Sequence, residues 1–349
     1  MTDYYSKILF VLRIDASIKG GGDLVQAKHY QKILEEELTC KVYFAHDLTK
    51  SELKNVEWDV VQLFNISRLH ENMTTIAELR YKRILLTPIL QPGFIFDFKA
   101  LIKTIIRGLL WRTFSLTLAR QSTNTILQQF DGFVFLSDSE KKAFFLQFPI
   151  LNKKENTIFH NGVAEGLTIG AQPRIFDFII VGRVEPKKRV IEAIDTVSTV
   201  TPKPLLLCVG GVNWYHPIYC AKFFLRVLRG NVVYLGKKES AAVFQFMRMT
   251  KTLLNFSELE VSPLVDLEAL ACGCNVISTI YSFPHQPISN HYERIDVKIE
   301  ELCVRAIRHS LTDRPLSELK INTWKENSSA YIKMIGEQTT NSELMQESK

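Results

Sequence analysis

The feature that most constrains the fold is a repeating alternation of short apolar runs with longer stretches of helical apolar spacing. Runs rich in Ile, Val, Leu and Phe without polar interruptions are typical of parallel strands, because both faces of such a sheet are covered. The intervening stretches supply the covering helices. The sequence therefore predicts an α/β protein built from open parallel sheets.

The predicted strands form two successive sets along the chain. Those of the first half are 8–14, 41–45, 60–65, 84–88 and 132–137. Those of the second half are 176–181, 204–209, 232–235, 252–256 and 275–279. Together they exceed one sheet of ordinary size, so we expect two doubly wound domains. Ser137 followed by Glu140 predicts a capping box where a strand passes into a helix.

The domain boundary is predicted where glycine, proline and small residues gather, in 162–173. We expect an N-terminal domain over 1–165, completed by a C-terminal helix at about 325–340. The C-terminal domain then covers 166–324, and a polar, flexible tail covers 338–349. Ligands of open parallel sheets bind beyond the carboxyl ends of the strands, so we expect the chemistry in the loops that leave them.

Composition and charge exclude several classes of protein. The chain of 349 residues is 46% hydrophobic and 23% charged, which excludes a disordered protein. A net charge of +6 is too mild at this length to indicate nucleic-acid binding. The sequence contains neither an apolar run long enough to span a bilayer nor a secretory cleavage pattern. We therefore expect a cytoplasmic, globular protein whose six cysteines, lacking a C-x-x-C pair, are buried free thiols.

The most informative segment is 257–278, SELEVSPLVDLEALACGCNVIS. Ser262 followed by Pro263 is typical of an N-cap and the first residue of a helix. Glu268 then lies on an apolar helix, and Glu260 lies in the loop before it. A carboxylate buried without partners costs several kcal/mol. Glu268 is therefore expected to have a polar partner, either a structural group of the protein or a ligand.

Basic residues follow the predicted strand 176–181. Arg183 and Lys188 leave its carboxyl end, where a doubly wound domain binds ligands. Arginine offers a fixed fork of donors that matches phosphate oxygens. These two cations are therefore predicted to bind a diphosphate. The alternative interpretation is a solvated basic patch that also includes Lys187 and Arg189.

Taken together, these motifs resemble the retaining GT-B glycosyltransferases of the E-x7-E type, the glycosyltransferase family 4-like, group 1 enzymes. Glu260 and Glu268 match the two acids, and the run from Glu268 to Gly273 matches the family's EAxAxG. The strand followed by Gly182-Arg183, with Lys188 five residues after the arginine, is also similar. Further similar features are the His160-Asn-Gly turn, the segment 231–236 and Trp324.

The resemblance implies two Rossmann-like domains facing each other across a cleft. It implies transfer of a sugar from a nucleotide-diphosphate donor to a glycan or lipid-linked glycan acceptor, with retention, in cell-surface polysaccharide biosynthesis. Arg183 and Lys188 would bind the diphosphate, Glu260 the donor sugar and Glu268 the ribose hydroxyls. The residues assigned to catalysis or donor binding are Gly21, Gly22, Gly182, Arg183, Lys188, Glu260, Ser262, Leu264 and Glu268.

Nothing in the sequence requires a metal or another cofactor. It has no D-x-D motif, and the nearest imitation, Asp266-Leu-Glu268, falls inside the apolar helix. Cationic side chains, together with the helix N-terminus near Ser262, would supply the positive charge. We therefore expect a metal-independent enzyme.

Two departures from the family pattern support a second hypothesis. Val261-Ser-Pro263 stands where family members have Gly-Phe-Gly, which leaves fewer free amides for phosphate. Arg189 stands where a glycine normally follows the lysine. These changes would fit a catalytically silent relative that binds a nucleotide sugar or carbohydrate.

A glycine-rich loop after the first strand supports a third hypothesis. Gly20-x-Gly22-x-x-Val25 nearly fits a dinucleotide fingerprint, and Asp47 follows the next strand. The third position is valine and the glycines lie far from the strand, so the fit to an NAD-dependent oxidoreductase is poor. A plain flexible loop is the other interpretation.

The segment 94–120 carries a basic stripe. Lys99, Lys103 and Arg107 recur every four residues, with aliphatic residues on the other faces. Such a helix fits the surface of an anionic membrane, which would place the protein peripherally at the inner face of the cell membrane. A core helix with a solvated cationic edge is the alternative.

Overall fold

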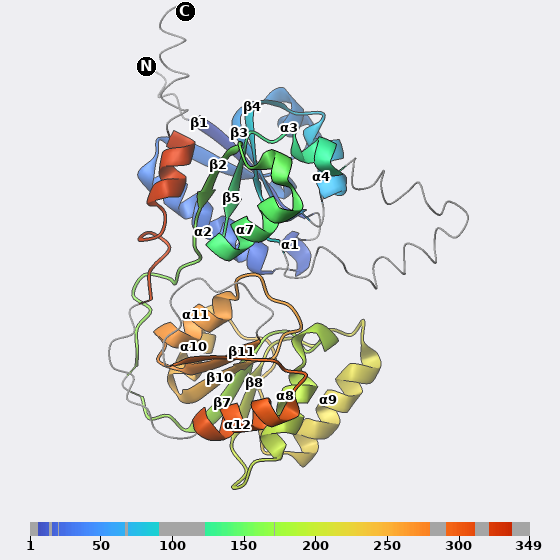
Figure 1. Ribbon diagram of the computed structural model, residues 1–349, viewed down its shortest axis with the longest axis vertical. Helices are drawn as coiled ribbons and strands as arrows, with labels where there is room; N and C mark the ends of the chain where they lie inside the picture. Colours follow the sequence, from blue (N-terminus) through green and yellow to red (C-terminus); the bar gives the residue numbers. More distant parts are fainter. Residues whose placement is uncertain are drawn as a thin grey trace, which may run out of the picture. The chain divides into compact units, whose positions relative to one another are not determined.

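The computed structural model describes residues 6–13, 16–19, 21–66, 69–90, 123–170, 172–279, 291–310 and 321–336. The chain divides into two compact units (Figure 1). Unit 1 comprises Met1–Asn161 and Trp324–Lys349, and unit 2 comprises Gly162–Thr323. The predicted membrane segment 94–120 and the predicted tail 338–349 lie outside the described residues.

Unit 1 contains one six-stranded sheet in the order β2-β1-β3-β4-β5-β6, with every neighbouring pair parallel. This arrangement confirms the predicted α/β class. The strands are β1 (Ser6–Val11), β2 (Cys40–Phe44), β3 (Glu57–Phe64), β4 (Arg80–Thr87), β5 (Gly132–Phe135) and β6 (Glu155–Ile158).

Alternate residues of a strand point to opposite sides of the sheet. Apolar side chains lie on both sides here, and helices cover both faces. Leu9 and Val11 of β1 belong to the core that α3, α4 and α7 cover. The helices of unit 1 are α1 (Ala16–Lys19), α2 (Gly22–Glu37), α3 (Lys50–Asn55), α4 (Leu69–Ile76), α7 (Asp138–Gln147) and residues 329–336, with short 3-10 turns η1 (Ala45–Asp47) and η4 (Pro149–Leu151).

The last described helix, 329–336, packs against α2 on the other face of this sheet. Tyr331 stacks on Phe159, with 4.9 Å between ring centroids, and Tyr30 of α2 stacks on the same ring at 4.3 Å. The buried hydroxyl of Tyr331 donates to Gln62 Oε1 at 2.6 Å. The chain therefore returns from unit 2 to complete the core of unit 1.

Unit 2 repeats the architecture with the order β12-β11-β10-β7-β8-β9, again with every neighbouring pair parallel. The strands are β7 (Phe176–Val181), β8 (Leu206–Val209), β9 (Val232–Tyr234), β10 (Thr250–Asn255), β11 (Asn275–Thr279) and β12 (Tyr292–Ile295). The helices are α8 (Val190–Ser198), α9 (Pro217–Arg229), α10 (Ser240–Arg248), α11 (Leu264–Ala271) and α12 (Glu300–Ser310), with the short 3-10 helix η5 (Pro186–Lys188).

Two separate cores form on the faces of the second sheet. Phe178 and Ile180 of β7 pack with α8, α9 and α12, whereas Ile179 packs with α10 and α11 (Figure 1). Because both faces are buried, β8 and most of β7 are apolar, as the sequence predicts. All six cysteines are free and buried, which confirms the prediction made from their spacing.

The sequence analysis missed one strand in each sheet, β6 and β12. Both lie at a sheet edge, where a strand has one neighbour and less of it needs to be buried. Their sequences, ENTI and YERI, are therefore mixed rather than apolar. A search for apolar runs cannot find strands of this kind.

Candidate active site

Two loops leave neighbouring strands at the carboxyl edge of the unit 2 sheet. One follows β7 and contains Gly182 to Arg189, and the other follows β10 and runs to Pro263. The Glu258 N–H donates to the Lys187 carbonyl at 2.7 Å, which ties the two loops together. Parallel topology thus brings residues about 75 positions apart to one edge of the sheet.

Glycines allow the loop after β7 to lie close to the loop after β8. Gly210 has a φ of +153°, and a Cβ there would lie 1.8 Å from the Gly182 carbonyl oxygen. Any side chain at this position would displace the backbone of Gly182. The sequence analysis missed Gly210 and Gly211, although a glycine pair directly after a predicted strand is the signal for such a contact.

Lys188 and Glu260 meet across the two loops. The Lys188 ammonium donates to Glu260 Oε1 at 2.5 Å, and both side chains are partly exposed. The lysine comes from η5 and the acid from the loop before α11, so the pair depends on the β7–β10 pairing. The structure therefore brings together two of the residues that the sequence assigns to catalysis.

Arg183 lies in the same loop as Lys188 and is half exposed. Its Nη2 lies 3.4 Å from Glu185 Oε1, and the buried Glu185 also accepts a hydrogen bond from Asn213 Nδ2 at 2.7 Å. Glu185 thus holds the loops after β7 and β8 together and lies beside the guanidinium. Sequence reasoning missed Glu185 and Asn213, because an isolated acid beside prolines and lysines carries no pattern.

Glu268 lies on α11 without a polar partner among the described residues. Burial raises the pKa of its carboxyl from 4.5 to about 7. No structural amide or arginine among the described residues fills the role of partner that the sequence analysis expected. A partly buried acid with a raised pKa and no partner among the described residues is a functional-site candidate.

A buried network supports the loop that carries Glu260. Asp266 of α11 accepts hydrogen bonds from Asn255 Nδ2 at 2.8 Å and from the Tyr292 hydroxyl at 2.9 Å. Asn255 Oδ1 in turn accepts from the Ser257 hydroxyl at 2.6 Å. Burial, with a smaller contribution from the charge of Glu260, raises the pKa of Asp266 to about 6, although the hydrogen bonds that it accepts partly oppose this rise. The sequence analysis read Asp266 only as an imitation of a metal motif.

The predicted start of α11 is wrong by one residue. Pro263, not Ser262, is the N-cap, and Leu264 is the first helical residue. Pro263 has a ψ of 107°, which is extended rather than helical, and no side chain caps this end. Ser262 directly precedes the N-cap, and Leu264 begins the helix.

Gly21 and Gly22 belong to unit 1, at the start of α2. Gly21 has a φ of +147°, and a Cβ there would meet Arg13 Nη2 at 2.5 Å. Arg13 Nε donates to Asp23 Oδ2 at 2.8 Å. A side chain at position 21 would strain the backbone and collide with the Arg13–Asp23 ion pair, so this position requires glycine. A Cβ at Gly22 would meet no atom within 4 Å.

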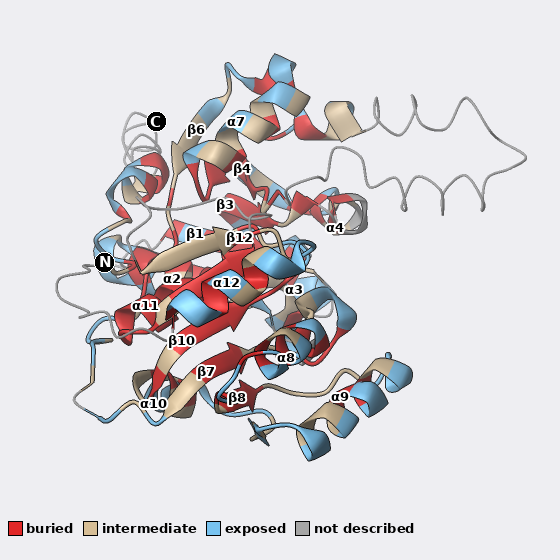
Figure 2. Ribbon diagram, turned by 60° about the horizontal axis from the view of Figure 1, so that its bottom comes forward, coloured by how far each residue is buried: buried red, intermediate tan, exposed pale blue. Residues whose placement is uncertain are grey.

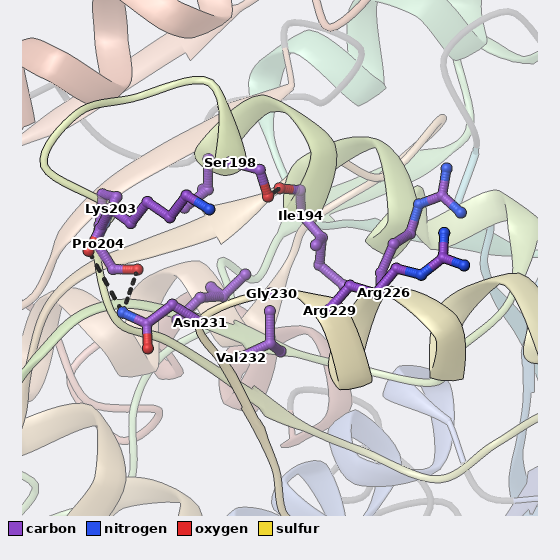
Figure 3. A pocket seen from close by; sticks show the side chains of 11 residues that line it. Ile194, Ser198, Lys203, Pro204, Arg226, Arg229, Gly230, Asn231 and Val232 are labelled. Atoms are coloured by element: carbon purple, nitrogen blue, oxygen red, sulfur yellow. Dashed lines mark hydrogen bonds between the residues drawn. The ribbon is translucent and has the colours of Figure 1, made fainter.

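A second hollow in unit 2 lies at the opposite edge of the sheet (Figure 3). Its volume is about 220 Å³, and residues that precede β8 and β9 line it. Asn231 donates from Nδ2 to the carbonyls of Lys203 and Pro204, while Arg226 and Arg229 point away from them. Basic residues at the carboxyl end of α9 match the helix dipole, which explains them without a ligand.

One protein-family model matches part of the chain. Residues 170–329 match the model of the family described as glycosyl transferases group 1. None of the curated proteins matches the sequence. Sucrose-phosphate synthase from Thermosynechococcus elongatus is similar in structure, with a TM-score of 0.64 at 12% identity over 98% of each chain.

Two further solved structures are similar over nearly the whole chain. The Anabaena protein HepE in complex with UDP-glucose has a TM-score of 0.63 at 15% identity, covering 99% of this chain and 100% of that one. The lipopolysaccharide outer core galactosyltransferase WaaB has a TM-score of 0.58 at 15% identity, covering 97% and 99%. At these identities the likeness establishes the fold. The chain therefore has the GT-B fold, and its residues 170–329 match the family model of glycosyl transferases group 1.

Proposed function

We propose that this protein is a retaining glycosyltransferase that moves a sugar from a nucleotide-diphosphate donor to a glycan or lipid-linked glycan. The observation that carries the proposal is the ion pair of Lys188 with Glu260, which lies in the loop before the helix that carries Glu268. A nucleotide-diphosphate sugar needs cations to bind its diphosphate and carboxylates to accept hydrogen bonds from its sugar hydroxyls. HepE, which has the same fold, is described in complex with UDP-glucose, so uridine nucleotides are the first donors to test.

The residues have distinct parts in the transfer. Arg183 and Lys188 bind the diphosphate, whose negative charge grows as the bond to the anomeric carbon breaks. Lysine has three donors, so Lys188 can hold Glu260 and a phosphate oxygen together. Glu260 lies by the donor sugar and stabilises its developing positive charge. The acceptor hydroxyl attacks from the face that the phosphate leaves, and the phosphate oxygen takes its proton.

Glu268 binds the ribose hydroxyls in this proposal. A carboxylate accepts two hydrogen bonds from a pair of adjacent hydroxyls, and burial makes each bond stronger. The donor would then provide the polar partner that Glu268 lacks in the protein alone. Binding is expected to lower the pKa of Glu268, because hydrogen bonds to the charged form favour ionisation.

We further propose that transfer needs no metal, because side chains already supply positive charge beside the diphosphate. Activity is expected to survive EDTA and to show no dependence on added Mg²⁺ or Mn²⁺. Loss of activity in EDTA with recovery on adding one of these ions would contradict this part of the proposal.

A second candidate, a silent relative that binds donor without transferring it, is favoured by one observation. Pro263 has no N–H and caps α11 without a side-chain hydrogen bond, so this loop offers phosphate fewer donors. Turnover separates the two candidates, since a silent relative would bind a nucleotide sugar yet neither transfer nor slowly hydrolyse it. The family match over residues 170–329 does not favour the oxidoreductase hypothesis.

The acceptor and the pathway rest on weaker support. WaaB, similar in fold, is described as a lipopolysaccharide outer core galactosyltransferase. We propose a cell-surface polysaccharide as the product and a lipid-linked glycan as the acceptor. Among the described residues, no helix combines the length and apolar character needed to cross a membrane.

The proposal is tested by measuring hydrolysis and transfer with labelled nucleotide sugars. Lys188→Ala is expected to lower turnover by about 100-fold or more, because it removes a cation beside the leaving group. Lys251→Ala is a matched control. Lys251 also pairs with an acid, Asp177 at 3.0 Å, has a similar exposure and joins the same two strands at their amino ends.

The control separates a chemical effect from loss of an ion pair. Near-normal turnover in Lys251→Ala with the predicted loss in Lys188→Ala supports a donor site at the carboxyl edge. Equal losses in the two variants, or normal turnover in Lys188→Ala, would contradict the assignment.

A further inference from the structure

Helix α9 and the residues before it expose several large apolar side chains to solvent. Trp214, Tyr215, Ile218, Leu225 and Leu228 are between 47% and 83% exposed, and we call them the α9 surface. Of the thirteen large hydrophobic residues exposed in the described chain, these five fall within fifteen consecutive positions. Scattered exposed apolar residues are normal, but a cluster of this kind marks an interaction site.

The helix is apolar on both sides. Cys220 and Phe223 point into the core of unit 2 and are fully buried. Ile218, Leu225 and Leu228 lie at helical spacing on the outer side, where α9 is coloured as exposed and intermediate (Figure 2). Packing within unit 2 therefore explains why the inner side of α9 is apolar. The apolar residues on the outer side are covered by no other part of the described structure.

Trp214 is held in place while its ring remains exposed. It stacks on Phe224, with 6.2 Å between ring centroids and 25° between planes, and is still 67% exposed. A fixed aromatic ring with one open side is suited to the boundary between water and an apolar phase.

Basic side chains outnumber acidic ones around the α9 surface. Residues 210–238 contain five lysines and arginines and no aspartate or glutamate. Arg226 is engaged by Asp195, which accepts two hydrogen bonds at 2.7 and 2.9 Å. Lys222 and Arg229 are exposed and flank the apolar stripe. A partner that covers this surface is therefore anionic as well as apolar.

The amino end of α9 lies next to the candidate active site of unit 2. An open pocket of about 410 Å³ is lined by Tyr215, His216, Ile218 and Lys222 and, on the other side, by Pro186 of η5. Lys188 belongs to the same short helix η5. The α9 surface thus continues up to the loop that carries Lys188.

We propose that the α9 surface docks on an anionic phospholipid bilayer. Trp214 and Tyr215 would lie at the level of the headgroups, the aliphatic residues would enter the acyl boundary, and Lys222 and Arg229 would contact anionic headgroups. A bilayer fits better than a protein partner because the surface is a single stripe flanked by two exposed cations, while the neighbouring acid Asp195 is already paired with Arg226. This contact lies in unit 2 and does not depend on the segment 94–120 or on the sugar chemistry.

The test is sedimentation of the full chain with vesicles of phosphatidylcholine alone or mixed with phosphatidylglycerol. The wild type is expected to bind the anionic vesicles at low salt and to be released at high salt. Lys222→Gln with Arg229→Gln should weaken binding about tenfold to thirtyfold, since each basic residue near the surface contributes about fivefold. Ile218→Ser with Leu228→Ser should weaken it by at least about tenfold.

Matched controls come from unit 1. Leu146 is 81% exposed, against 82% for Leu228, and Ile150 is 64% exposed, against 74% for Ile218. Leu146→Ser with Ile150→Ser is therefore expected to leave vesicle binding unchanged. Circular dichroism and a nucleotide thermal-shift assay on every variant show that unit 2 remains folded, so failure of docking is distinguished from failure of the proposed function.

A spectroscopic readout reports on the contact itself. Anionic vesicles should shift the fluorescence of the wild type to shorter wavelength, and the shift should disappear in Trp214→Phe. The proposal is overturned if the wild type does not bind anionic vesicles, or if the α9 variants bind as tightly as the wild type. It is also overturned if sedimentation equilibrium shows a wild-type dimer that the α9 variants dissociate, because a second copy would then cover the surface.

Discussion

Two glutamates, the buried Glu140 in unit 1 and the partly buried Glu268 in unit 2, share a residue type, a helix setting and a pKa that desolvation raises to about 7. Their partners differ. Glu140 accepts hydrogen bonds from the backbone N–H groups of Leu90 at 2.7 Å and Leu136 at 2.6 Å. Glu268 has no such partner among the described residues.

This difference separates a structural acid from a candidate ligand-binding acid. Glu140 joins the segments that follow β4 and β5, so its burial costs are offset within the protein. Glu268 is only partly buried, and no hydrogen-bonding group among the described residues offsets its desolvation, a state that a protein retains where function requires it. Burial alone therefore does not identify a functional acid, but burial without partners does.

The largest expected effect is on activity. Glu268→Ala should lower turnover of the nucleotide sugar by about 100-fold to 1000-fold, because a charge-assisted contact to the donor is lost. Its free energy of unfolding should not fall, since the side chain has no partner to lose. Steady-state kinetics and urea unfolding of the same preparation test both statements. Near-normal turnover of Glu268→Ala would contradict the assignment of Glu268 as a ligand-binding acid.

The next effect is on stability. Glu140→Leu should lower the free energy of unfolding by about 3 kcal/mol, because two buried backbone N–H groups lose their acceptor. Asp138→Ala, an exposed acid in the same first turn of α7, should change it by less than about 0.5 kcal/mol. Urea unfolding gives both values. If Glu140→Leu were as stable as the wild type, the structural role of Glu140 would be wrong.

The raised pKa of Glu268 predicts a pH dependence of stability. Below about pH 4.5 the carboxyl is protonated in both folded and unfolded chains, so it has no effect. Between pH 4.5 and about 7 the unfolded chain loses the proton first, and the folded state is progressively destabilised. Glu268→Gln should therefore be more stable than the wild type by about 2 kcal/mol at pH 8 and equally stable at pH 4.5.

Measuring unfolding of both proteins across this range isolates Glu268, because Glu140 is present in each. A constant difference between the two proteins from pH 4.5 to 8 would show that Glu268 does not titrate in this range. The two glutamates would then differ in their hydrogen-bond partners but would not share a raised pKa.

The smallest effect concerns Arg189, which has a φ of 48° and a ψ of 40° in the left-handed region. A glycine adopts this conformation without strain, so Arg189→Gly should raise the free energy of unfolding by about 0.5–1 kcal/mol. Thermal unfolding measures the change. A loss of stability would mean that contacts of the guanidinium outweigh the backbone strain.

The sequence predicted the parts of the fold that follow from burial on both faces. β7 and β11 have the predicted bounds, and each contains an apolar run, Phe178–Val181 in β7 and Val276–Ile277 in β11. The capping box at Ser137 is only half formed. Ser137 accepts from the Glu140 N–H at 3.1 Å, but the Glu140 carboxylate binds Leu136 and Leu90 instead. Local pattern could not reveal this, because Leu90 is distant in the chain.

The candidate site could be predicted where spacing carries the information. Glu260 and Glu268 were found because their separation and the apolar helix between them form a motif. Glu185, Asn213 and Asn255 were not found, because their roles depend on which loops the sheet order brings together. The predicted roles of the site residues remain proposals, since no bound donor shows them.

The central claim is that Glu268 is the partner of a nucleotide ribose. Its direct test is calorimetric titration of the wild type and Glu268→Ala with the nucleoside diphosphate that gives the largest thermal shift, and with the 2′,3′-dideoxy form of that nucleotide. We predict that removing the hydroxyls weakens binding to the wild type by about tenfold or more and leaves binding to Glu268→Ala unchanged. An equal loss in both proteins, or no binding of any nucleoside diphosphate to the wild type, would contradict the account.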